Sequence, residues 1–384
     1  NNILIRSAIP EVVTMGQRFR QQGYQSVRVG KIFHYDNPGT IGTSGMDDIY
    51  SWDQTINPYG RDKVEEYKIK TLSPRRYGGT LSWMAAEGKD EEQTDGIGAS
   101  EAINQLNKFS KSGNNFFLAV GFYKPHTPFV SPKKYFNLYD KEKIPIPTSS
   151  SSYLETLPTP AAKSIRAKKN QIDLNDTLSK EIKQAYYASI SFVDAQVGRI
   201  LNTLRETGLD KNTIIVFTSD HGYHLGEHGH WQKKTLFDNA TKVPLIITVP
   251  GFQDEVVINN SPVELIDIYP TLMDLTKINK PNHVIGKSLY PIINKKTEYV
   301  RDNALTRWEN GYSLKTNRFR ITQWGENGIL GYELYDHKLD PQELKNLAKD
   351  SKHLLILDSL KTILSQRIIN AKIKPNGLGK QIQN

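Results

Sequence analysis

An apolar run that ends on a carboxylate and an imidazole restricts the fold of this chain most. The run is Thr213-Ile214-Ile215-Val216-Phe217-Thr218, and Ser219, Asp220 and His221 follow it directly. A β-branched apolar run of this length is typical of a buried strand. In open α/β folds, ligands bind at the carboxyl edge of the sheet, where such a strand delivers its last polar residues. We therefore expect the chemistry of this protein at Asp220 and His221.

Length and composition allow a sizeable core. The chain has 384 residues, of which 37% are hydrophobic and 24% charged, which suits one large domain with a smaller one. It contains no cysteine, so disulfides, thiolate zinc sites and cysteine nucleophiles are excluded. No apolar stretch approaches the roughly eighteen residues that a membrane span needs, so we expect no membrane span.

The net charge is positive and points toward polyanions. Lysine and arginine number 50 against 41 aspartates and glutamates, which gives a formal charge of +9. Nucleic acid and sulfated or uronic polysaccharide are the polyanions that such a surface attracts, and a solvated basic face is the plainer explanation. The sequence has no zinc-finger spacing, RNA-binding aromatic signature or helix-turn-helix pattern, so we expect no nucleic-acid partner.

Hydrophobic periodicity predicts alternating helices and strands, hence an α/β fold. We expect helices at 14–22, 99–109, 178–207 and 263–275, and strands at 26–29, 116–120, 213–218 and 245–249. The stretch 36–95 lacks a clear period and is interpreted as a long irregular insertion, while 144–160 is a linker rich in proline and serine. From Gly311 the pattern becomes that of antiparallel strands, followed by a helix at 351–370. We place a catalytic domain at 1–298 and a C-terminal subdomain at 299–384.

Three of the predicted strands are followed by similar polar residues. Lys31 and His34 follow the first, Lys124-Pro125-His126 the second, and Asp220-His221 the third, with Lys233 thirteen residues beyond Asp220. If the sheet is largely parallel, these strand ends converge. Lysines would neutralise the oxygens of a sulfate or phosphate, a histidine would protonate the departing oxygen, and a hard cation held by Asp and His would withdraw charge.

The histidine cluster after Asp220 has plainer explanations. His224, His228 and His230 follow His221 within ten residues. A structural zinc site is one alternative, which the absence of cysteine disfavours. We expect these three imidazoles to lie behind the metal ligands or to face solvent, and Tyr223 and Trp231 to be aromatic residues at the rim of the site.

Collinear motifs in this chain resemble one enzyme family. Residues 218–223 (Thr-Ser-Asp-His-Gly-Tyr) and 225–229 (Leu-Gly-Glu-His-Gly) look like the metal-binding core of sulfatases of the iduronate-2-sulfatase type. Residues 30–34 (Gly-Lys-Ile-Phe-His) and 124–129 (Lys-Pro-His-Thr-Pro-Phe) match the same group. The similarity continues to Asp340-Pro341 in the same order and covers nearly the whole chain.

The resemblance implies an alkaline-phosphatase-like α/β sandwich, with a large mostly parallel sheet between helices and a small C-terminal subdomain of an antiparallel sheet and a helix. It also implies a calcium-dependent sulfatase site and a periplasmic or secreted location. By motif match, Asp220 and His221 are metal ligands. Lys31 and His34 hold the oxygens of the nucleophile, and His126 and Lys233 bind the sulfate and assist the leaving oxygen. Tyr223 would contact the sugar.

The chain departs from the family in two motifs. Such sulfatases have an Asp-Asp pair after an apolar strand, and a Cys/Ser-x-Pro-x-Arg motif whose first residue is oxidised to formylglycine. Here no cysteine exists, no proline has a serine two positions before it, and Asp47-Asp48 does not follow an apolar strand. We therefore expect that the segment with the pair and the formylglycine lies outside this sequence. The Ca²⁺ site would then be incomplete, metal binding weak, and this polypeptide inactive by itself.

The sequence leaves three functions open. The favoured one is a sulfatase that acts on sulfate esters of an acidic saccharide or a glycosaminoglycan-like polysaccharide. A phosphodiester or phosphonate hydrolase of the same superfamily and a non-catalytic protein that binds sulfated glycan are the alternatives. The sulfated saccharide is the expected partner in the first and the last case. The particular sugar and the oligomeric state are not set by the sequence.

Overall fold

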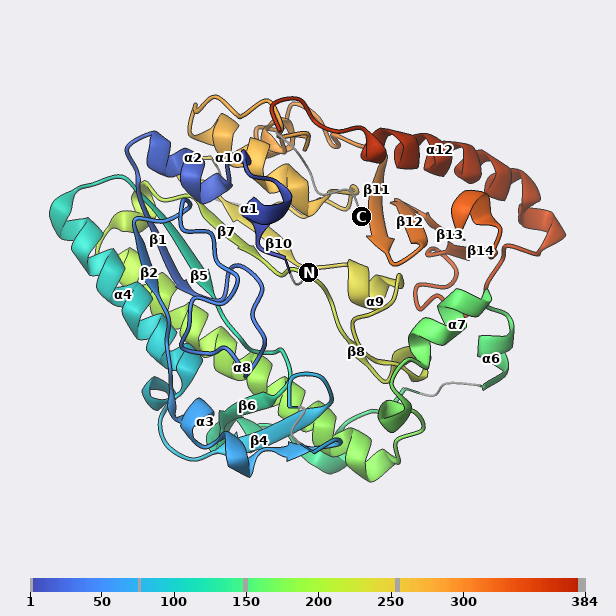
Figure 1. The fold of residues 1–384 in the computed structure, drawn as a ribbon, viewed down its shortest axis with the longest axis horizontal. Coiled ribbons are helices and arrows are strands. Elements are labelled where there is room, and N and C mark those ends of the chain that lie inside the picture. Colours follow the sequence, from blue (N-terminus) through green and yellow to red (C-terminus); the bar gives the residue numbers. More distant parts are fainter. Residues whose placement is uncertain (1–2, 75–76, 148–150, 253–255, 379–384) are drawn as a thin grey trace. The chain divides into compact units, whose positions relative to one another are not determined.

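The computed structural model describes residues 3–74, 77–147, 151–252 and 256–378. Contacts divide the chain into two compact units, each described here by itself (Figure 1). The first unit comprises 1–146, 174–213 and 378–384, and the second comprises 147–173 and 214–377. The predicted domain boundary between 298 and 299 stays a prediction. None of the described helices is long and apolar enough to cross a bilayer.

A parallel sheet forms the centre of the first unit. Its strands are β1 (Gln25–Gly30), β2 (Gln54–Ile56) and β5 (Phe116–Gly121), in the order β2-β1-β5. Both neighbours run parallel to β1, and Gly30 lies opposite Gly121 at the carboxyl ends of their strands. The predicted strands at 26–29 and 116–120 are therefore confirmed, and they end at the same edge.

Helices cover both faces of this sheet. Phe116 of β5 stacks on Phe109 of α4 (Thr94–Ser112), with ring centroids 4.4 Å apart. Phe117, the next residue of the strand, stacks on Phe19 of α2 (Met15–Gln21) at 4.8 Å. Because successive side chains of a strand point to opposite faces, α4 and α2 lie on opposite sides of the sheet. This arrangement confirms the α/β fold with a parallel sheet between helices.

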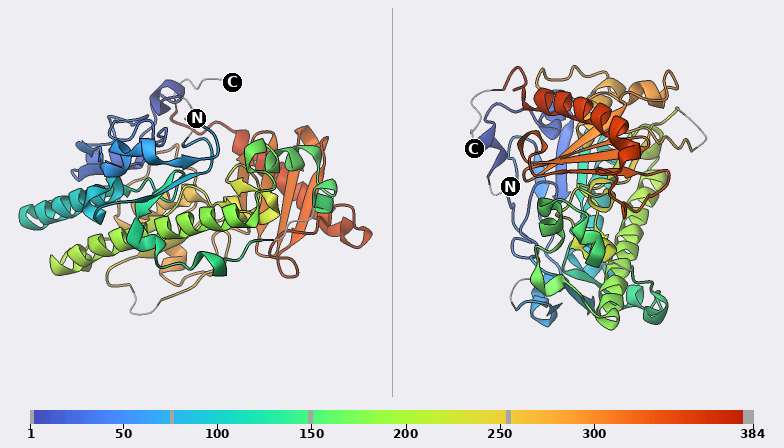
Figure 2. Two further views of the ribbon diagram at one scale, coloured as in Figure 1. Left: turned by 90° about the horizontal axis from the view of Figure 1, so that it is seen from below. Right: turned by 90° about the vertical axis from the view of Figure 1, so that its right-hand side faces the viewer.

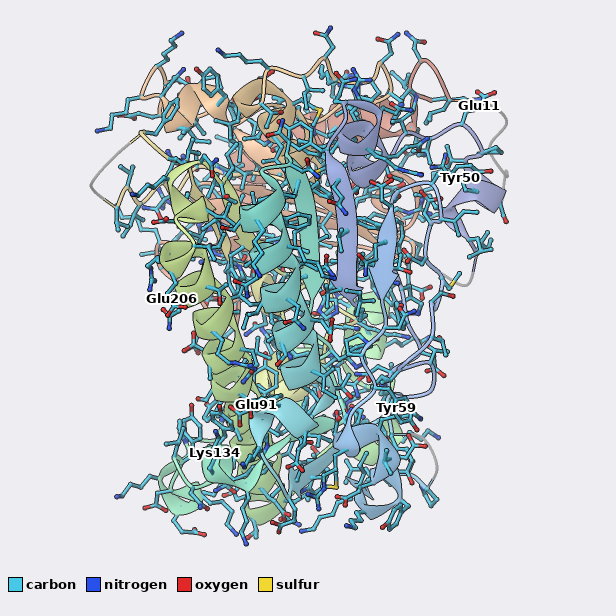
Figure 3. The ribbon with its side chains drawn as sticks, turned by 90° about the vertical axis from the view of Figure 1, so that its left-hand side faces the viewer. Glu11, Tyr50, Tyr59, Glu91, Lys134 and Glu206 are labelled. Carbon is cyan, nitrogen blue, oxygen red and sulfur yellow. The ribbon has the colours of Figure 1, made fainter. Side chains whose placement is uncertain are left out.

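The longest helix, α8 (Asp176–Glu206), packs along α4, and Figure 3 shows the two side by side. The helix begins where the Asn175 side chain accepts a hydrogen bond from the main-chain nitrogen of Leu178, and Gly208 follows its end in the left-handed conformation. The predicted helix is confirmed. Its buried face is made of other residues than predicted, since Ile182 and Leu204 are buried but Tyr186, Val193, Val197 and Ile200 are half-buried. Ala185, Ala188 and Phe192 are among the residues buried instead.

The expectation of an irregular insertion at 36–95 is wrong in part. Besides β2, this stretch contains α3 (Arg61–Val64), β3 (Lys70–Thr71) and β4 (Ser82–Ala86). β4 pairs in parallel with β6 (Phe129–Pro132) and antiparallel with β3. Strands of two to five residues are too short to show a hydrophobic period, so their pairing partners, remote in sequence, determine them. The other short helices of this unit are α1 (Ile5–Ala8) and α5 (Lys133–Phe136).

In the second unit, the strand that precedes Asp220 is β7 (Ile215–Thr218), which pairs antiparallel with β10 (Leu245–Thr248). The strand is predicted correctly but not its burial, since Phe217 is 41% exposed. Among the described strands only β10 pairs with it. Further elements of this unit are β8 (His224–Leu225), β9 (Trp231–Gln232), α6 (Ser151–Glu155), α7 (Thr159–Ile165), α9 (Asp238–Thr241), α10 (Ile268–Leu275) and α11 (Tyr290–Ile293).

An antiparallel sheet with one helix completes the second unit, as predicted. Its strands are β11 (Asn303–Trp308), β12 (Gly311–Thr316), β13 (Phe319–Trp324) and β14 (Tyr332–Asp336), paired in sequence order. The helix α12 (Leu354–Lys372) lies across this sheet (Figure 2). Leu314, Ile321 and Leu334 of the sheet are fully buried in one core cluster with Leu360 and Leu364 of α12.

Candidate active site

The segments that carry Lys31 and His126 leave the parallel sheet side by side. The main-chain nitrogen of Lys31 donates to the carbonyl of Gly121 at 2.8 Å. A Cβ added to Gly121 would lie 1.7 Å from the carbonyl oxygen of Lys31, and Gly30 has a φ of +71°. Only glycine allows this close approach of the two chains. The loops 31–34 and 122–126 therefore start at the same point of the sheet edge, with Lys31 and His126 half-buried and His34 exposed.

His126 has a fixed orientation. Its Nδ1 lies 2.6 Å from the carbonyl oxygen of Thr127, and the Asn37 side-chain nitrogen donates to the same oxygen at 3.2 Å. A carbonyl only accepts hydrogen bonds, so Nδ1 carries the proton and Nε2 is the nitrogen that can receive or deliver a second one. Asn37 is buried and follows His34 by three residues, so it joins the His34 loop to the His126 loop.

Asp95 positions the main chain before His126 and was not predicted from the sequence. This carboxylate, in the first turn of α4, accepts hydrogen bonds from the main-chain nitrogens of Tyr123 and Lys124 at 2.9 Å each. Burial raises the pKa of Asp95 to about 6, against the attraction of the Lys124 ammonium, which lowers it. The Lys124 ammonium is itself buried, 3.9 Å from Asp62. Lys124 is therefore a structural residue, and no local motif marks Asp95.

The acidic pair Asp47-Asp48 is engaged by arginines. Arg28, fully buried in β1, donates to Asp47 at 2.6 Å, and Arg6 donates to Asp48 at 2.9 Å. Burial raises the pKa of Asp48, but hydrogen bonds from Arg6 and Ser51 outweigh it and leave this pKa below its ordinary value. Both carboxylates thus have structural partners.

In the second unit, Asp220 and His221 face each other at the end of β7. Oδ2 of Asp220 lies 3.6 Å from Nε2 of His221, and Nδ1 of His221 lies 2.8 Å from the carbonyl oxygen of Gly222. The carbonyl contact places a proton on Nδ1, so in the neutral ring Nε2 presents a lone pair to the carboxylate. Two facing acceptors favour a proton or a cation between them. The 67% exposure of the Asp220 side chain leaves it accessible to such an ion.

One carboxylate and one imidazole do not complete a calcium site. Ca²⁺ takes about six to eight oxygen-rich ligands, and Asp220 and His221 supply two. Within the described ranges, the group of three or more side chains close enough to share one ion is a different one, made of Asp238, His337 and Glu343. The two predicted ligands would hold one side of an ion, and the calcium site itself stays a prediction.

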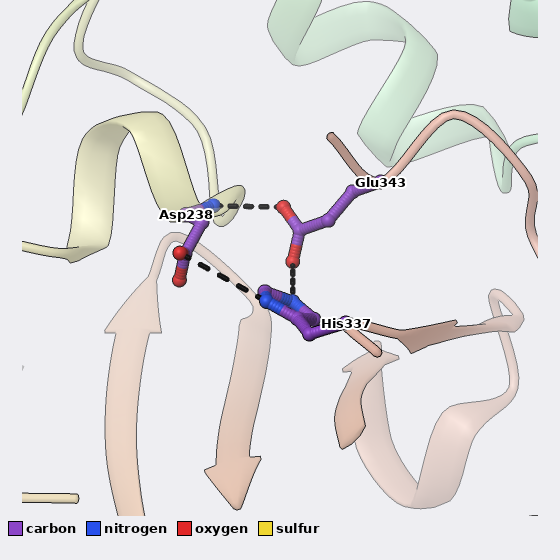
Figure 4. A group of neighbouring side chains, drawn as sticks. All are labelled: Asp238, His337 and Glu343. Carbon is purple, nitrogen blue, oxygen red and sulfur yellow. Dashed lines mark hydrogen bonds and ion pairs between the residues drawn. The ribbon is translucent and has the colours of Figure 1, made fainter. Parts of the chain in front are cut away.

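The group of Asp238, His337 and Glu343 is an ion-pair network (Figure 4). Nε2 of His337 lies 2.7 Å from Glu343, and the main-chain nitrogen of Asp238 donates to Glu343 at 2.8 Å. The buried guanidinium of Arg320 donates to Glu343 at 2.5 Å and also to Asp238. Burial raises the pKa of Glu343, but Arg320 and His337 outweigh it and hold this pKa at about 2. Arg320 already supplies the cation of this group, which therefore has no need of a metal.

The other three histidines of the cluster are buried, so of the two alternatives expected for them, the one in which they face solvent is wrong. His224, His228 and His230 are at most 4% exposed. They lie on the hairpin of β8 and β9, where the rings of His224 and His230 are 4.9 Å apart and His228 stacks on Phe237 at 4.1 Å. Burial lowers the pKa of His228 and of His230 to about 4. These imidazoles are neutral core residues, and their packing partners are too remote in sequence for the local pattern to reveal them.

Tyr223 and Lys233 lie at the two ends of the same hairpin. Tyr223 precedes β8 and Lys233 follows β9, and both are half-buried. Gly222 anchors the start of the hairpin, because its nitrogen donates to the carbonyl of Ala240 at 2.8 Å and a Cβ there would lie 2.1 Å from the oxygen of Asn239. Trp231 is 4% exposed and belongs to the core, so the expectation that it lies at a rim is wrong.

The predicted site residues thus form two groups. Lys31, His34 and His126 lie on the two loops that start at one edge of the parallel sheet of the first unit. Asp220, His221, Tyr223 and Lys233 lie on β7 and the hairpin of the second unit. Convergence of the two groups into one cleft stays a prediction, as do the roles of the individual residues.

Comparison with known proteins decides the family. The Sulfatase family model matches residues 4–278. The chain belongs to the sulfatase family. A second model, N-sulphoglucosamine sulphohydrolase C-terminal, matches residues 226–370 of this sulfatase. A sulfatase of Formosa agariphila is 32% identical over 93% of this chain and 70% of its own length, and human iduronate 2-sulfatase is 31% identical over 88% and 77%. These findings confirm the resemblance to sulfatases of the iduronate-2-sulfatase type.

Solved structures confirm the alkaline-phosphatase-like fold of this sulfatase. A phosphonate monoester hydrolase from Silicibacter pomeroyi superposes with a TM-score of 0.75 over 93% of this chain and 80% of its own, at 21% identity. A 2-O GAG sulfatase superposes with a TM-score of 0.67 over 94% and 74%, at 23% identity. A third, in complex with its substrate D-glucosamine-2-N,6-O-disulfate, also has a TM-score of 0.67, over 94% and 83% at 20% identity.

Proposed function

We propose that this protein hydrolyses a sulfate ester on an acidic saccharide of the glycosaminoglycan type, through a formylglycine nucleophile. The observation that carries the proposal is the pair of neighbouring strand ends from which the loops with Lys31 and His126 start, in a chain of the sulfatase family. Support for the substrate class comes from iduronate 2-sulfatase among its relatives and from the GAG sulfatase among its structural neighbours. The positive net charge of +9 suits an anionic polysaccharide.

We assign a separate catalytic or binding role to each predicted site residue of this chain. Lys31 and His34 hold the oxygens of the formylglycine hydrate, whose segment is not among these 384 residues. Lys233 neutralises the sulfate, and His126 delivers a proton from Nε2 to the leaving sugar oxygen while the Thr127 carbonyl fixes its ring. A Ca²⁺ ion held in part by Asp220 and His221 would withdraw charge from the sulfate oxygens. Tyr223 contacts the sugar, and the protein works in the periplasm or outside the cell.

The test is a kinetic comparison in the complete polypeptide with formylglycine in place. The His126→Ala and Lys233→Ala variants are assayed on a sulfate ester with a poor leaving group, with Lys163→Ala, an exposed lysine, as the control. Loss of a general acid typically costs about a hundredfold to ten-thousandfold in rate. We expect such a loss with little change in thermal stability. Unchanged rates in both variants would contradict the assigned roles.

Two other outcomes of the same assay would change the function. The fold is shared with a phosphonate monoester hydrolase, so phosphonate and phosphodiester substrates are included. Turnover of these esters with none of sulfate esters would identify a phosphoryl or phosphonyl hydrolase. Binding of sulfated glycan without turnover of any ester by the complete polypeptide would identify a binding protein.

A further inference from the structure

A second lysine is held next to Lys233 from a different part of the second unit. Lys168 lies in the segment that follows α7, sixty-five residues before Lys233. Its ammonium donates a hydrogen bond to the side-chain oxygen of Gln232, the residue directly before Lys233. Lys168 is half-buried, so its long side chain is held in place rather than extended into solvent. Lys168 and Lys233 are thereby attached to the same turn of chain.

Gln232 contributes a further donor at this place. Its side chain is 6% exposed, and its φ of +80° is uncommon for a residue other than glycine. A lysine only donates, so the side-chain oxygen of Gln232 faces Lys168 and the amide nitrogen points elsewhere. That nitrogen is buried with no hydrogen-bond partner among the described residues. A buried donor without an acceptor destabilises the protein, so an acceptor that reaches this nitrogen would bind favourably.

The three lysines around Gln232 repel one another. Lys234 is the third lysine, and its ammonium lies 5.7 Å from the ring centroid of Trp308. Burial, together with the charges of Lys234 and Lys233, lowers the pKa of Lys168 to about 8. Ammonium groups that repel each other in a partly desolvated place are stabilised when an anion binds between them. The cluster of Lys168, Gln232, Lys233 and Lys234 therefore has the chemistry of an anion-binding site.

We propose that Lys168 and the amide of Gln232 bind a second anionic group of the saccharide, a carboxylate or a further sulfate, apart from the ester that Lys233 addresses. This proposal rests on the proposed function and adds a determinant of specificity to it. One lysine holds the ester to be cleaved, and the other selects saccharides that carry another negative charge. Sugars whose only negative charge is the sulfate ester would lack the second contact, so the enzyme would discriminate against them.

The test measures binding in the complete polypeptide with its nucleophile residue left unoxidised, so that the sulfate esters are bound but not hydrolysed. Calorimetry compares two pairs of ligands. The first pair is 2-O-sulfated iduronic acid and its carboxyl methyl ester, and the second is 2-N,6-O-disulfated glucosamine and 6-O-sulfated N-acetylglucosamine. The ratio of the two Kd values in each pair reports the contribution of the second anion. We expect Lys168→Gln to reduce this ratio at least tenfold for the pair whose second anion occupies the site. Lys169→Gln, an exposed neighbour, serves as the control and should keep the wild-type ratio.

A conservative variant separates charge from packing. Lys168→Arg keeps a positive charge at high pH, whereas the ammonium of wild-type Lys168 loses its proton above pH 8. The wild-type preference for the doubly charged ligands should therefore fall above this pH and persist in Lys168→Arg. A ratio that Lys168→Gln leaves unchanged in both pairs would overturn the second site. If the complete polypeptide bound none of the four ligands, the proposed function itself would fail.

Discussion

The carboxylate of Asp95 accepts a hydrogen bond of 2.9 Å from the main-chain nitrogen of Lys124, two residues before the imidazole that we assign as the general acid. It accepts a second bond of 2.9 Å from Tyr123. A helix start on one face of the sheet thereby fixes the loop that follows β5. The orientation of His126 depends on this support, although Asp95 itself is buried and does not face solvent.

Replacing Asp95 by alanine should destabilise the protein and loosen the His126 loop. Two buried main-chain donors would lose their acceptor, and each such group costs roughly 1–3 kcal/mol. We expect the free energy of unfolding to fall by about 2–4 kcal/mol in urea titrations. Asn104→Ala, at an exposed position of the same helix, is the control. A variant as stable as the wild type would show that Asp95 does not support this loop.

Periodicity predicts the long elements of this fold and fails on the short ones. The 31 residues of α8 and the alternating strands after Gly311 contain enough repeats of the hydrophobic period to be recognised from the sequence. β2 and β4, with three and five residues, do not. Their pairing with β1 and β6 is set by contacts across long stretches of chain, which no local pattern contains.

The ends of the strands predict which residues lie at the site, but not which residues surround and support them. A polar residue directly after a buried strand reaches the edge of the sheet whatever the rest of the chain does, so the common edge of Lys31 and His126 could be predicted. The support from Asp95 and Asn37 joins elements 29 and 90 residues apart and has no local signal. For the same reason, the spacing of His228 and His230 does not distinguish an exposed histidine from one packed in the core.

Substituting Gly121 by alanine should disturb the edge where Lys31 and His126 meet. The added Cβ would lie 1.7 Å from the oxygen of Lys31, which is main chain and cannot rotate away. Overpacking typically costs about 1–3 kcal/mol, and a main-chain obstacle favours the upper end of that range. Gly198→Ala is the matched control, since α8 has open space there and alanine favours the helix by about 0.5–1 kcal/mol. Equal effects of both substitutions on thermal stability would contradict the close approach.

Glu333 should make the protein less stable as the pH rises toward neutrality. Burial raises its pKa to about 7, against hydrogen bonds from Trp324 and Tyr335 that lower it. An acid with a raised pKa keeps its proton to a higher pH in the folded state than in the unfolded state, so stability is lost as the pH rises from about 4.5 through 7. The shift corresponds to a loss of about 3 kcal/mol.

The Glu333→Gln variant tests this dependence, because a neutral amide cannot ionise. Relative to the wild type, its free energy of unfolding should increase between pH 5 and pH 8. Leu334→Ala leaves a cavity in the same strand, and its cost should not vary with pH. A constant difference between Glu333→Gln and the wild type across this range would exclude a raised pKa of Glu333.

The buried histidines should destabilise the protein in acid, in the opposite sense to Glu333. Burial lowers the pKa of His228 to about 4, so between about pH 6.5 and pH 4 the unfolded chain binds a proton that the folded chain does not. The stability contributed by this neutral ring is complete above pH 6.5 and falls by about 3 kcal/mol as the pH drops through that window.

His228→Phe keeps a ring against Phe237, with which His228 stacks at 4.1 Å, and removes the titrating group. Denaturant unfolding at pH 7 and pH 4.5 should therefore show the variant gaining stability relative to the wild type in acid. Leu357→Ala, a buried apolar truncation of the same unit, should show the same cost at both pH values. If the difference between His228→Phe and the wild type were also independent of pH, His228 would have to titrate alike in the folded and unfolded chains, and the neutral core imidazole would be disproved.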